Sequence, residues 1–142
     1  MQPRIDHIQI TVKDMAKAER FYDQLMPILG FDLSKKLKGR SEAHDFDAIE
    51  YVHANITIGI NSPRKSLSAE NVHRRRPGSL HHIAFQAKSD LEVNNAYAAI
   101  LKTEAQIVAP PQLYPQHGAY YYALFFKDPD GIKLEIVFER RN

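Results

Sequence analysis

The 142-residue sequence contains no cysteine. Disulfides, thiolate metal ligands and a cysteine nucleophile are therefore excluded, which fits a cytoplasmic protein. The sequence also has no apolar run approaching the roughly 18 residues of a membrane span. Its first residues, MQPRIDHIQITV, lack the apolar stretch of a secretion signal. We expect a cytoplasmic protein that neither enters a membrane nor uses thiol chemistry.

Charge is nearly balanced, with a formal net charge of +2, and the composition is 44% hydrophobic and 25% charged. These values are typical of an ordinary globular protein with one core or two small half-domains. The densest basic run, residues 73–76, precedes Pro77 and Gly78 and has no interleaved aromatic residues. We interpret it as a solvated linker and expect no nucleic-acid partner.

The sequence contains an internal repeat. IDHIQITV (5–12) aligns with LHHIAFQA (80–87), so that His7 falls on His82 and Asp6 falls on His81. At the same offset, apolar residues with helical spacing recur in 14–29 and 90–103, behind N-cap candidates Asp14 and Ser89. The repeat predicts two copies of one structural unit.

Strand-like runs follow each predicted helix. They cover Phe31–Leu37, Ala48–His53, Asn55–Ile60, Gln106–Ala109, Tyr120–Phe126 and Lys133–Phe138. We expect Pro27 to end or kink the first helix, and the proline-rich segment Pro110–Gly118 to be an irregular loop. Each half then reads strand–helix–strand–strand–strand. The predicted organisation is a single domain, 1–142, made of modules 1–61 and 79–142 joined by a linker, 62–78.

Strand alternation separates the adjacent histidines of LHHIAFQA. Neighbouring strand residues point to opposite faces, so His81 shares a face with Ile83 and is expected to be packed or at a rim. His82 faces the other way, and so does His7, opposite the apolar residues that pack under the helix. A satisfied or merely exposed histidine is the ordinary alternative, but the equivalent placement in both copies argues against it.

A carboxylate completes a candidate metal site. In KDPDGIKLEIVF (127–138) a turn precedes a strand on which Glu135 lies between apolar neighbours and faces away from them. An exposed glutamate on an edge strand has the same pattern. Two neutral imidazoles with one carboxylate suit Fe²⁺, Mn²⁺, Zn²⁺ or Ni²⁺ and leave positions free for a substrate.

The chain resembles the vicinal oxygen chelate superfamily, which includes glyoxalase I, extradiol dioxygenases, methylmalonyl-CoA epimerase and bleomycin and fosfomycin resistance proteins. The resemblance rests on DHIQITVKD with RFYDQLMPILGF, on LHHIAF and on DPDGIKLEIV. It implies an α+β fold of two βαβββ modules that form a cup-like curved mixed sheet with the helices outside. It also implies metal ligands at His7, His82 and Glu135.

The family pattern also has a fourth metal-ligand position, and this sequence departs from the pattern there. The position lies on the last strand of the first module, where we expect Thr57 in NITIGIN. Threonine is a poor ligand, so the resemblance argues against an orthodox glyoxalase I and for a three-ligand site. Glu50 and His53 on the preceding strand are less favoured replacements.

The aromatic stretch 119–126 is expected to line the site. If Lys127–Gly131 is the connection, Ala123 falls opposite Glu135. The residues on that face are then Tyr121, Ala123 and Phe125. A shorter connection would instead present Tyr120, Tyr122 and Leu124. The family resemblance favours Tyr121, whose hydroxyl can donate a hydrogen bond or act as an acid.

Two functions fit this pattern. The first is a metalloenzyme that chelates a small oxygenated substrate on one divalent metal and stabilises an oxyanion or enolate, with Tyr121 as the catalytic group and Gln9, Thr57 and Phe125 contacting substrate. Isomerisation, lyase chemistry, thiol transfer and dioxygenation remain open. The second is a metal-free small-molecule binder of the bleomycin resistance type. In either case we expect a homodimer whose cup forms within one chain or across two.

Overall fold

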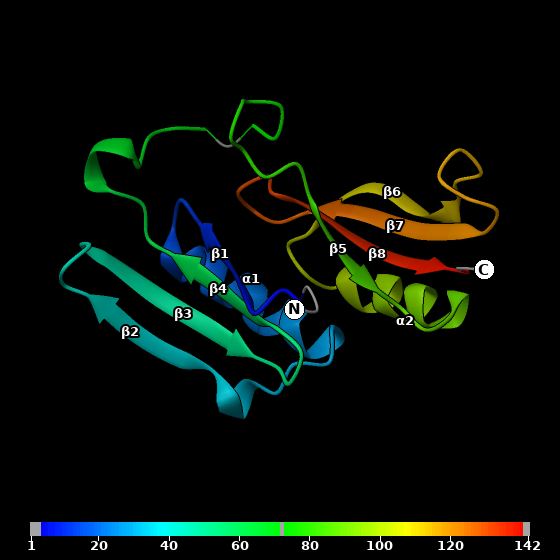
Figure 1. Cartoon of the computed structure of the whole chain (residues 1–142), viewed down its shortest axis with the longest axis horizontal. Helices are drawn as coiled ribbons and strands as arrows, with labels where there is room; N and C mark the ends of the chain where they lie inside the picture. The colour runs from blue at the N-terminus through cyan, green and yellow to red at the C-terminus, as the bar shows by residue number, and fades with distance from the viewer. Residues whose placement is uncertain (1–3, 72, 141–142) are drawn as a thin grey trace. The chain divides into compact units, whose positions relative to one another are not determined.

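The computed structural model describes residues 4–71 and 73–140. The chain divides into two compact units, 1–71 and 72–142. Each unit contains one helix and one four-stranded mixed sheet (Figure 1). The two units repeat the same order, strand–helix–strand–strand–strand, which confirms the predicted α+β class and the pair of βαβββ modules.

The first unit is built from one sheet with the strand order β1-β4-β3-β2. Strand β1 is parallel to β4, and the other neighbours are antiparallel. The bounds are β1 His7–Thr11, α1 Met15–Ile28, β2 Leu37–Ser41, β3 Phe46–Val52 and β4 Thr57–Asn61. Short 3-10 helices occupy Leu33–Lys35 and Lys65–Leu67.

The second unit repeats this topology with the order β5-β8-β7-β6. Strand β5 is parallel to β8, as β1 is to β4. The bounds are β5 Ile83–Gln86, α2 Asp90–Ile100, β6 Gln106–Leu113, β7 Tyr121–Lys127 and β8 Lys133–Glu139. No helix among the described residues is long and apolar enough to cross a membrane.

Both helices begin at the predicted caps. The carboxylate of Asp14 accepts a hydrogen bond from the Lys17 amide, and Ser89 does the same for the Glu92 amide. Helix α1 buries its apolar stripe, formed by Ala18, Phe21, Tyr22, Leu25 and Met26. Pro27 lies in the last turn, and the chain leaves the helix through Gly30 at φ +88°. Helix α2 buries Val93, Ala96 and Ile100, whereas Leu91 and Leu101, in the same run of apolar residues, are exposed.

Two sequence predictions of local structure were wrong. The run Phe31–Leu37 is not a strand, because Asp32 caps a 3-10 helix by accepting a hydrogen bond from the Ser34 amide. Strand β2 therefore starts only at Leu37. The prolines of 110–118 do not exclude a strand, because β6 lies at the sheet edge and its register shifts on both sides of Ala109. Edge positions and bulges tolerate proline, which cannot donate to a neighbouring strand.

The turn before β8 closes one residue later than expected. Asp128 is buried, and its Oδ1 accepts hydrogen bonds from the amides of Asp130 and Ile132. Lys127 therefore pairs with Lys133, and Phe125 rather than Ala123 lies opposite Glu135. The register differs from the prediction by two residues on β8. A shift of two preserves the side-chain faces, so the expected set on the glutamate's face is correct.

Candidate metal and substrate site

The sheet of the second unit has one face packed under α2 and one open face. Leu134 and Ile136 of β8 are buried on the helix side, and Glu135 lies between them on the open side. Its cross-strand neighbours are Ala84 on β5 and Phe125 on β7. The surroundings on this face are mainly apolar: Ala109, Tyr114, Tyr121, Ala123, Phe125 and Val137. Glu135 is nevertheless only 1% exposed.

Two side chains meet the two oxygens of this buried carboxylate. Tyr121 donates its hydroxyl hydrogen to Oε1 at 2.5 Å, and Nε2 of His82 lies 3.1 Å from Oε2. A buried carboxylate is costly unless it is paired and hydrogen-bonded, and here both oxygens are engaged. Glu135 is therefore fixed by one group from β7 and one from the segment entering β5.

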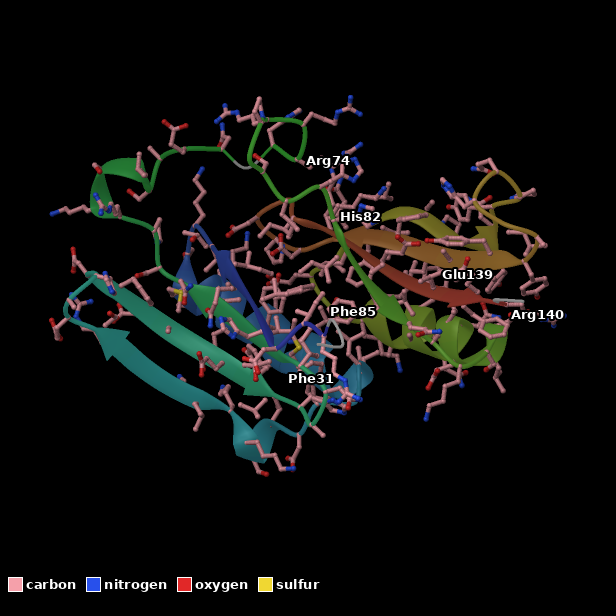
Figure 2. The ribbon with its side chains drawn as sticks, in the orientation of Figure 1. Phe31, Arg74, His82, Phe85, Glu139 and Arg140 are labelled. Carbon is pink, nitrogen blue, oxygen red and sulfur yellow. The ribbon has the colours of Figure 1, made fainter. Side chains whose placement is uncertain are left out.

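Strand alternation does not separate the adjacent histidines, because both precede β5, which begins at Ile83, and their ring centroids lie 5.0 Å apart. His82 lies just before β5 (Figure 2), and its Nε2 meets Glu135. His81 is exposed, and its Nδ1 lies 2.7 Å from Nδ1 of His82. Loss of solvent contact and the nearby cationic side chains lower the pKa of His81, which favours its neutral form. His82 thus contacts Glu135 directly, whereas His81 contacts the ring of His82.

Tyr121 keeps its proton in this environment. Burial, followed by the hydrogen bond to Glu135, raises the pKa of its phenol. Its ring contacts Tyr114 and His117, with centroids 6.5 and 5.3 Å away. The phenol is therefore a hydrogen-bond donor at neutral pH, held by packing against neighbouring rings.

The corresponding face of the first unit carries the other predicted site residues. His7 is exposed, and its Nδ1 lies 2.8 Å from Oδ1 of Asp6. A histidine whose one ring nitrogen contacts a carboxylate presents the other to a ligand, a common arrangement around metals. Thr57 pairs directly with His7 across the parallel strands, so both lie on one face.

The strand registers place a glycine, not Thr57, at the position equivalent to Glu135. Ala84 pairs with Glu135 in the second unit, and its counterpart Gln9 pairs with Gly59 in the first. A Cβ at Gly59 would collide with the side-chain amide of Gln9, which lies over the glycine. The expected placement of Thr57 at the fourth position is thus corrected by two residues, and that position carries no ligand side chain.

A carboxylate is present on the neighbouring strand instead. Glu50 of β3 pairs with Gly59, and its Oε1 accepts a hydrogen bond from the Gln9 amide at 3.0 Å. Gln9, predicted as a substrate contact, is therefore also a partner of Glu50. This link was not anticipated, because it requires the register of three strands.

Glu50 also borders a hollow of about 270 Å³ on the same face. The hollow exists because the paired residues Gly39 and Ala48 have little or no side chain. The remaining residues around it are Leu37, Lys38, Arg40, Ser41 and Phe46. All of these residues belong to the hairpin formed by β2 and β3.

The donor set fits a divalent metal in part. Within the described residues, no three His, Cys, Asp or Glu side chains are grouped so as to hold a metal ion. His82 and Glu135 form a pair whose 3.1 Å separation is close to that of two ligands bound at about 2.0–2.2 Å to one ion. The second unit thus offers two donors, and a third has to come from elsewhere.

The family model for the glyoxalase/bleomycin resistance protein/dioxygenase superfamily matches residues 4–136. The chain belongs to this superfamily. Solved structures with the same fold include a glyoxylase/bleomycin resistance protein/dioxygenase domain from Frankia sp. EAN1pec. It has a TM-score of 0.79 and 24% identity, and the match covers 99% of this chain and 100% of that one. A glyoxalase/bleomycin resistance protein from Albidiferax ferrireducens T118 has a TM-score of 0.70 and 22% identity, with 94% and 98% covered.

Two relatives are similar in sequence. Protein YqjT of Bacillus subtilis is 26% identical over 131 residues, which is 92% of this chain and 95% of that protein. The 2,2',3-trihydroxybiphenyl dioxygenase of Sphingomonas paucimobilis is 27% identical over 138 residues, 94% of this chain. The match spans only 40% of the length of that dioxygenase.

Proposed function

We propose that the protein is a metal-dependent enzyme that acts on a small molecule with two adjacent oxygen atoms. The observation that carries the proposal is the pair of His82 and Glu135, in which a carboxylate only 1% exposed meets an imidazole nitrogen on a mainly apolar face. Purely structural burial of a carboxylate is costly, so its retention here favours a ligand role.

The proposed ligands are His82 and Glu135 from the second unit and His7 from the first. A bound divalent metal would act as a Lewis acid on the two substrate oxygens. Tyr121 has one hydroxyl proton, which it donates to Glu135. In the proposed reaction that same proton would be redirected to a substrate oxygen. Phe125, Gln9 and Thr57 are the proposed substrate contacts.

Among the possible reactions, dioxygenation of a vicinal diol is favoured. Two facts support it: the similarity to a trihydroxybiphenyl dioxygenase and the glycine at the fourth ligand position, which leaves a three-ligand site. Dioxygen would be the co-substrate, with both of its atoms entering the product as a ring carbon–carbon bond is cleaved. Glyoxalase chemistry with a fourth, carboxylate ligand on β4 is disfavoured by Gly59.

The alternative is a metal-free binding protein of the bleomycin resistance type. It is supported by the family itself, which contains such proteins. It gives no reason for a histidine and a buried glutamate to meet on the open face.

Metal analysis of protein purified without chelators tests the proposal. We expect about one divalent ion per chain and, for Glu135→Gln and His82→Ala, metal affinity weaker by about 100-fold or more. The matched controls Glu104→Gln and His81→Ala change exposed side chains and should retain wild-type affinity. Oxygen uptake with catechol as probe then tests the reaction class.

A folded wild-type protein that takes up no Fe²⁺, Mn²⁺, Zn²⁺ or Ni²⁺ would contradict the enzyme proposal and favour the metal-free binder. Equal losses in His81→Ala and His82→Ala would contradict the assigned ligand. Metal binding without oxygen uptake would exclude dioxygenation as the reaction, and isomerisation, lyase chemistry and thiol transfer would stay as the candidates.

A further inference from the structure

A lysine lies beside the His82–Glu135 pair. Lys133 is two residues before Glu135 on β8 and therefore shares its open face. Its Nζ lies 4.1 Å from the centroid of the Phe125 ring, and Phe125 is paired with Glu135 and lies 6.5 Å from the His82 ring. The aromatic ring holds the ammonium group over the site and compensates part of its lost hydration.

Two arginines add positive charge at the same place. Arg74 and Arg75 belong to the segment that leads into β5 (Figure 2). Arg74 acts electrostatically on both Lys133 and His81, and Arg75 acts on His81. Backbone hydrogen bonds from Arg76 to His73 and from Ser79 to Arg76, each 3.0 Å, form successive turns in this segment. These residues, expected to be a solvated linker, lie close to the candidate site.

This positive charge is not balanced by carboxylates. In the described part of the chain, no salt bridge joins Arg74, Arg75 or Lys133 to an acidic side chain. Glu135 attracts Lys133 electrostatically, but Tyr121 and His82 engage its two oxygens. Lys133 and Arg74 are close enough to act on each other electrostatically. Like charges repel, so an anion between them would relieve this repulsion and gain charge-assisted hydrogen bonds.

We propose that Lys133 and Arg74 form a binding site for the carboxylate of a small aromatic substrate, next to the position of its two adjacent oxygens. The proposal rests on the proposed function and adds the substrate class, an aromatic carboxylate. The rings of Phe125, Tyr121 and Tyr114 on the same face provide apolar contact for the aromatic part. A nucleic acid fits less well, because the ammonium of Lys133 lies against a buried ring beside a buried carboxylate rather than along an exposed stripe.

Calorimetric titration with two matched probes tests this site. Catechol and 2,3-dihydroxybenzoate both offer two adjacent oxygens, and only the second carries a carboxylate. We expect metal-loaded wild-type protein to prefer the carboxylate probe by about tenfold or more, the scale of a hydrogen bond to a charged group. Raising the salt from about 0.05 M to about 0.5 M should reduce this preference.

Variants identify the residues responsible. Lys133→Met keeps the apolar stem over Phe125, and Arg74→Gln removes only the neighbouring charge. Each variant should lower the affinity for the carboxylate probe alone, so that the two probes bind with more nearly equal affinity. The control Lys102→Met, at an exposed position beyond α2, should leave the preference unchanged. Equal affinity of wild type for both probes, or an unchanged preference in folded Lys133→Met and Arg74→Gln, would overturn the proposal.

The same experiment separates this site from the metal site. Metal-free protein is titrated with benzoate, which carries a carboxylate and no adjacent oxygens. Benzoate binding that is lost in Lys133→Met supports the anion site even if the metal proposal fails. No benzoate binding and no preference between the catechols would overturn the anion site while leaving the metal proposal intact. Displacement of benzoate by a short DNA duplex at equal phosphate concentration would instead assign the patch to nucleic acid.

Discussion

The hydroxyl of Tyr121 is the donor for Oε1 of Glu135, and no second donor to that oxygen is found among the described residues. Tyr121→Phe removes this donor and keeps the ring. We expect a loss of about 1–3 kcal/mol in the free energy of unfolding, because a buried acceptor is left unsatisfied. Metal affinity should fall by about 10-fold, since the ligand loses the group that orients it.

Tyr120→Phe, at the residue just before β7, is the matched control. Its hydroxyl bonds Asp90 of α2 and makes no contact with the candidate site. Chemical denaturation and chelator competition on both variants provide the measurements. If Tyr120→Phe lowers metal affinity as much as Tyr121→Phe, the hydroxyl of Tyr121 has no special relation to the metal.

At the scale of single residues, the sequence predicted the site's composition better than its contacts. Strand alternation placed Glu135 on the open face, and the repeat with His7 singled out His82. Tyr121 was chosen over Tyr120 from the family resemblance, and the two-residue difference in register left its face unchanged. The link between Gln9 and Glu50 and the ammonium of Lys133 over Phe125 could not be predicted. They depend on pairing registers and on which side chain fills the space above a glycine.

At the scale of elements, the two units differ in a set of three residues that pair across three neighbouring strands. The first unit has Gln9, Gly59 and Glu50 where the second has Ala84, Glu135 and Phe125. The double change Gln9→Ala with Gly59→Glu gives the first unit the second unit's pattern on β1 and β4. The smaller alanine removes the amide that would collide with a side chain at 59.

We expect this double variant to bind Zn²⁺ and Mn²⁺ about tenfold more tightly, because it adds an anionic oxygen on the face of His7. Each single change is a control: Gln9→Ala adds no ligand, and Gly59→Glu has to displace Gln9. Competitive chelator titration gives the affinities. Unchanged or weaker binding by a folded double variant would show that position 59 does not reach the metal.

Helix α1 is tied to the sheet of its unit by a charged cluster. Lys36, just before β2, donates hydrogen bonds to Glu19 and Asp23 of α1, and the buried Tyr51 of β3 donates to Asp23. Hydrogen bonds from Lys36, and then Lys38, lower the pKa of Glu19 below its usual 4.5. Glu19 therefore contributes stability above that pH, and the contribution is lost as the pH falls through the lowered pKa.

Lys36→Met should cost about 1 kcal/mol at neutral pH, since the pair is only partly shielded from water. The variant should also lose less stability than wild type on acidification below about pH 4.5, because its Glu19 is less perturbed. Lys35→Met, an exposed neighbour, is the control. Urea unfolding at a series of pH values measures both effects. Parallel pH curves for wild type and Lys36→Met would contradict this assignment.

The element order was predictable because both helices have caps and regular apolar spacing. The internal repeat also gave the same predicted order of strands and helix in both halves of the sequence. Boundaries were less predictable where a side chain competes with the backbone. Asp32 starts a 3-10 helix in a run that reads as a strand, and Asp128 closes its turn one residue late. Such hydrogen bonds, which short polar side chains accept from nearby backbone amides, are local, but their outcome depends on burial in the folded unit.

At the scale of the whole molecule, the proposed ligands come from both units, and two arrangements are open: a set completed within one chain, or one completed by exchange of units between two copies. His7→Ala should weaken metal binding about as strongly as His82→Ala, because each removes one imidazole ligand. Chelator titration of the two separate variants tests this first. Tight metal binding by His7→Ala would remove His7 from the ligand set.

Mixing the two variants then distinguishes the two arrangements. If each site lies within one chain, every chain in the mixture lacks a ligand and no tight binding returns. If sites are shared across a dimer, about half of the dimers formed after unfolding and refolding together are mixed, and each mixed dimer has one intact site. About a quarter of the wild-type metal capacity should then reappear. Recovery that needs joint refolding, and that is absent when the native variants are simply combined, would establish exchange of units, because only reassembly can bring His7 of one copy to Glu135 of the other.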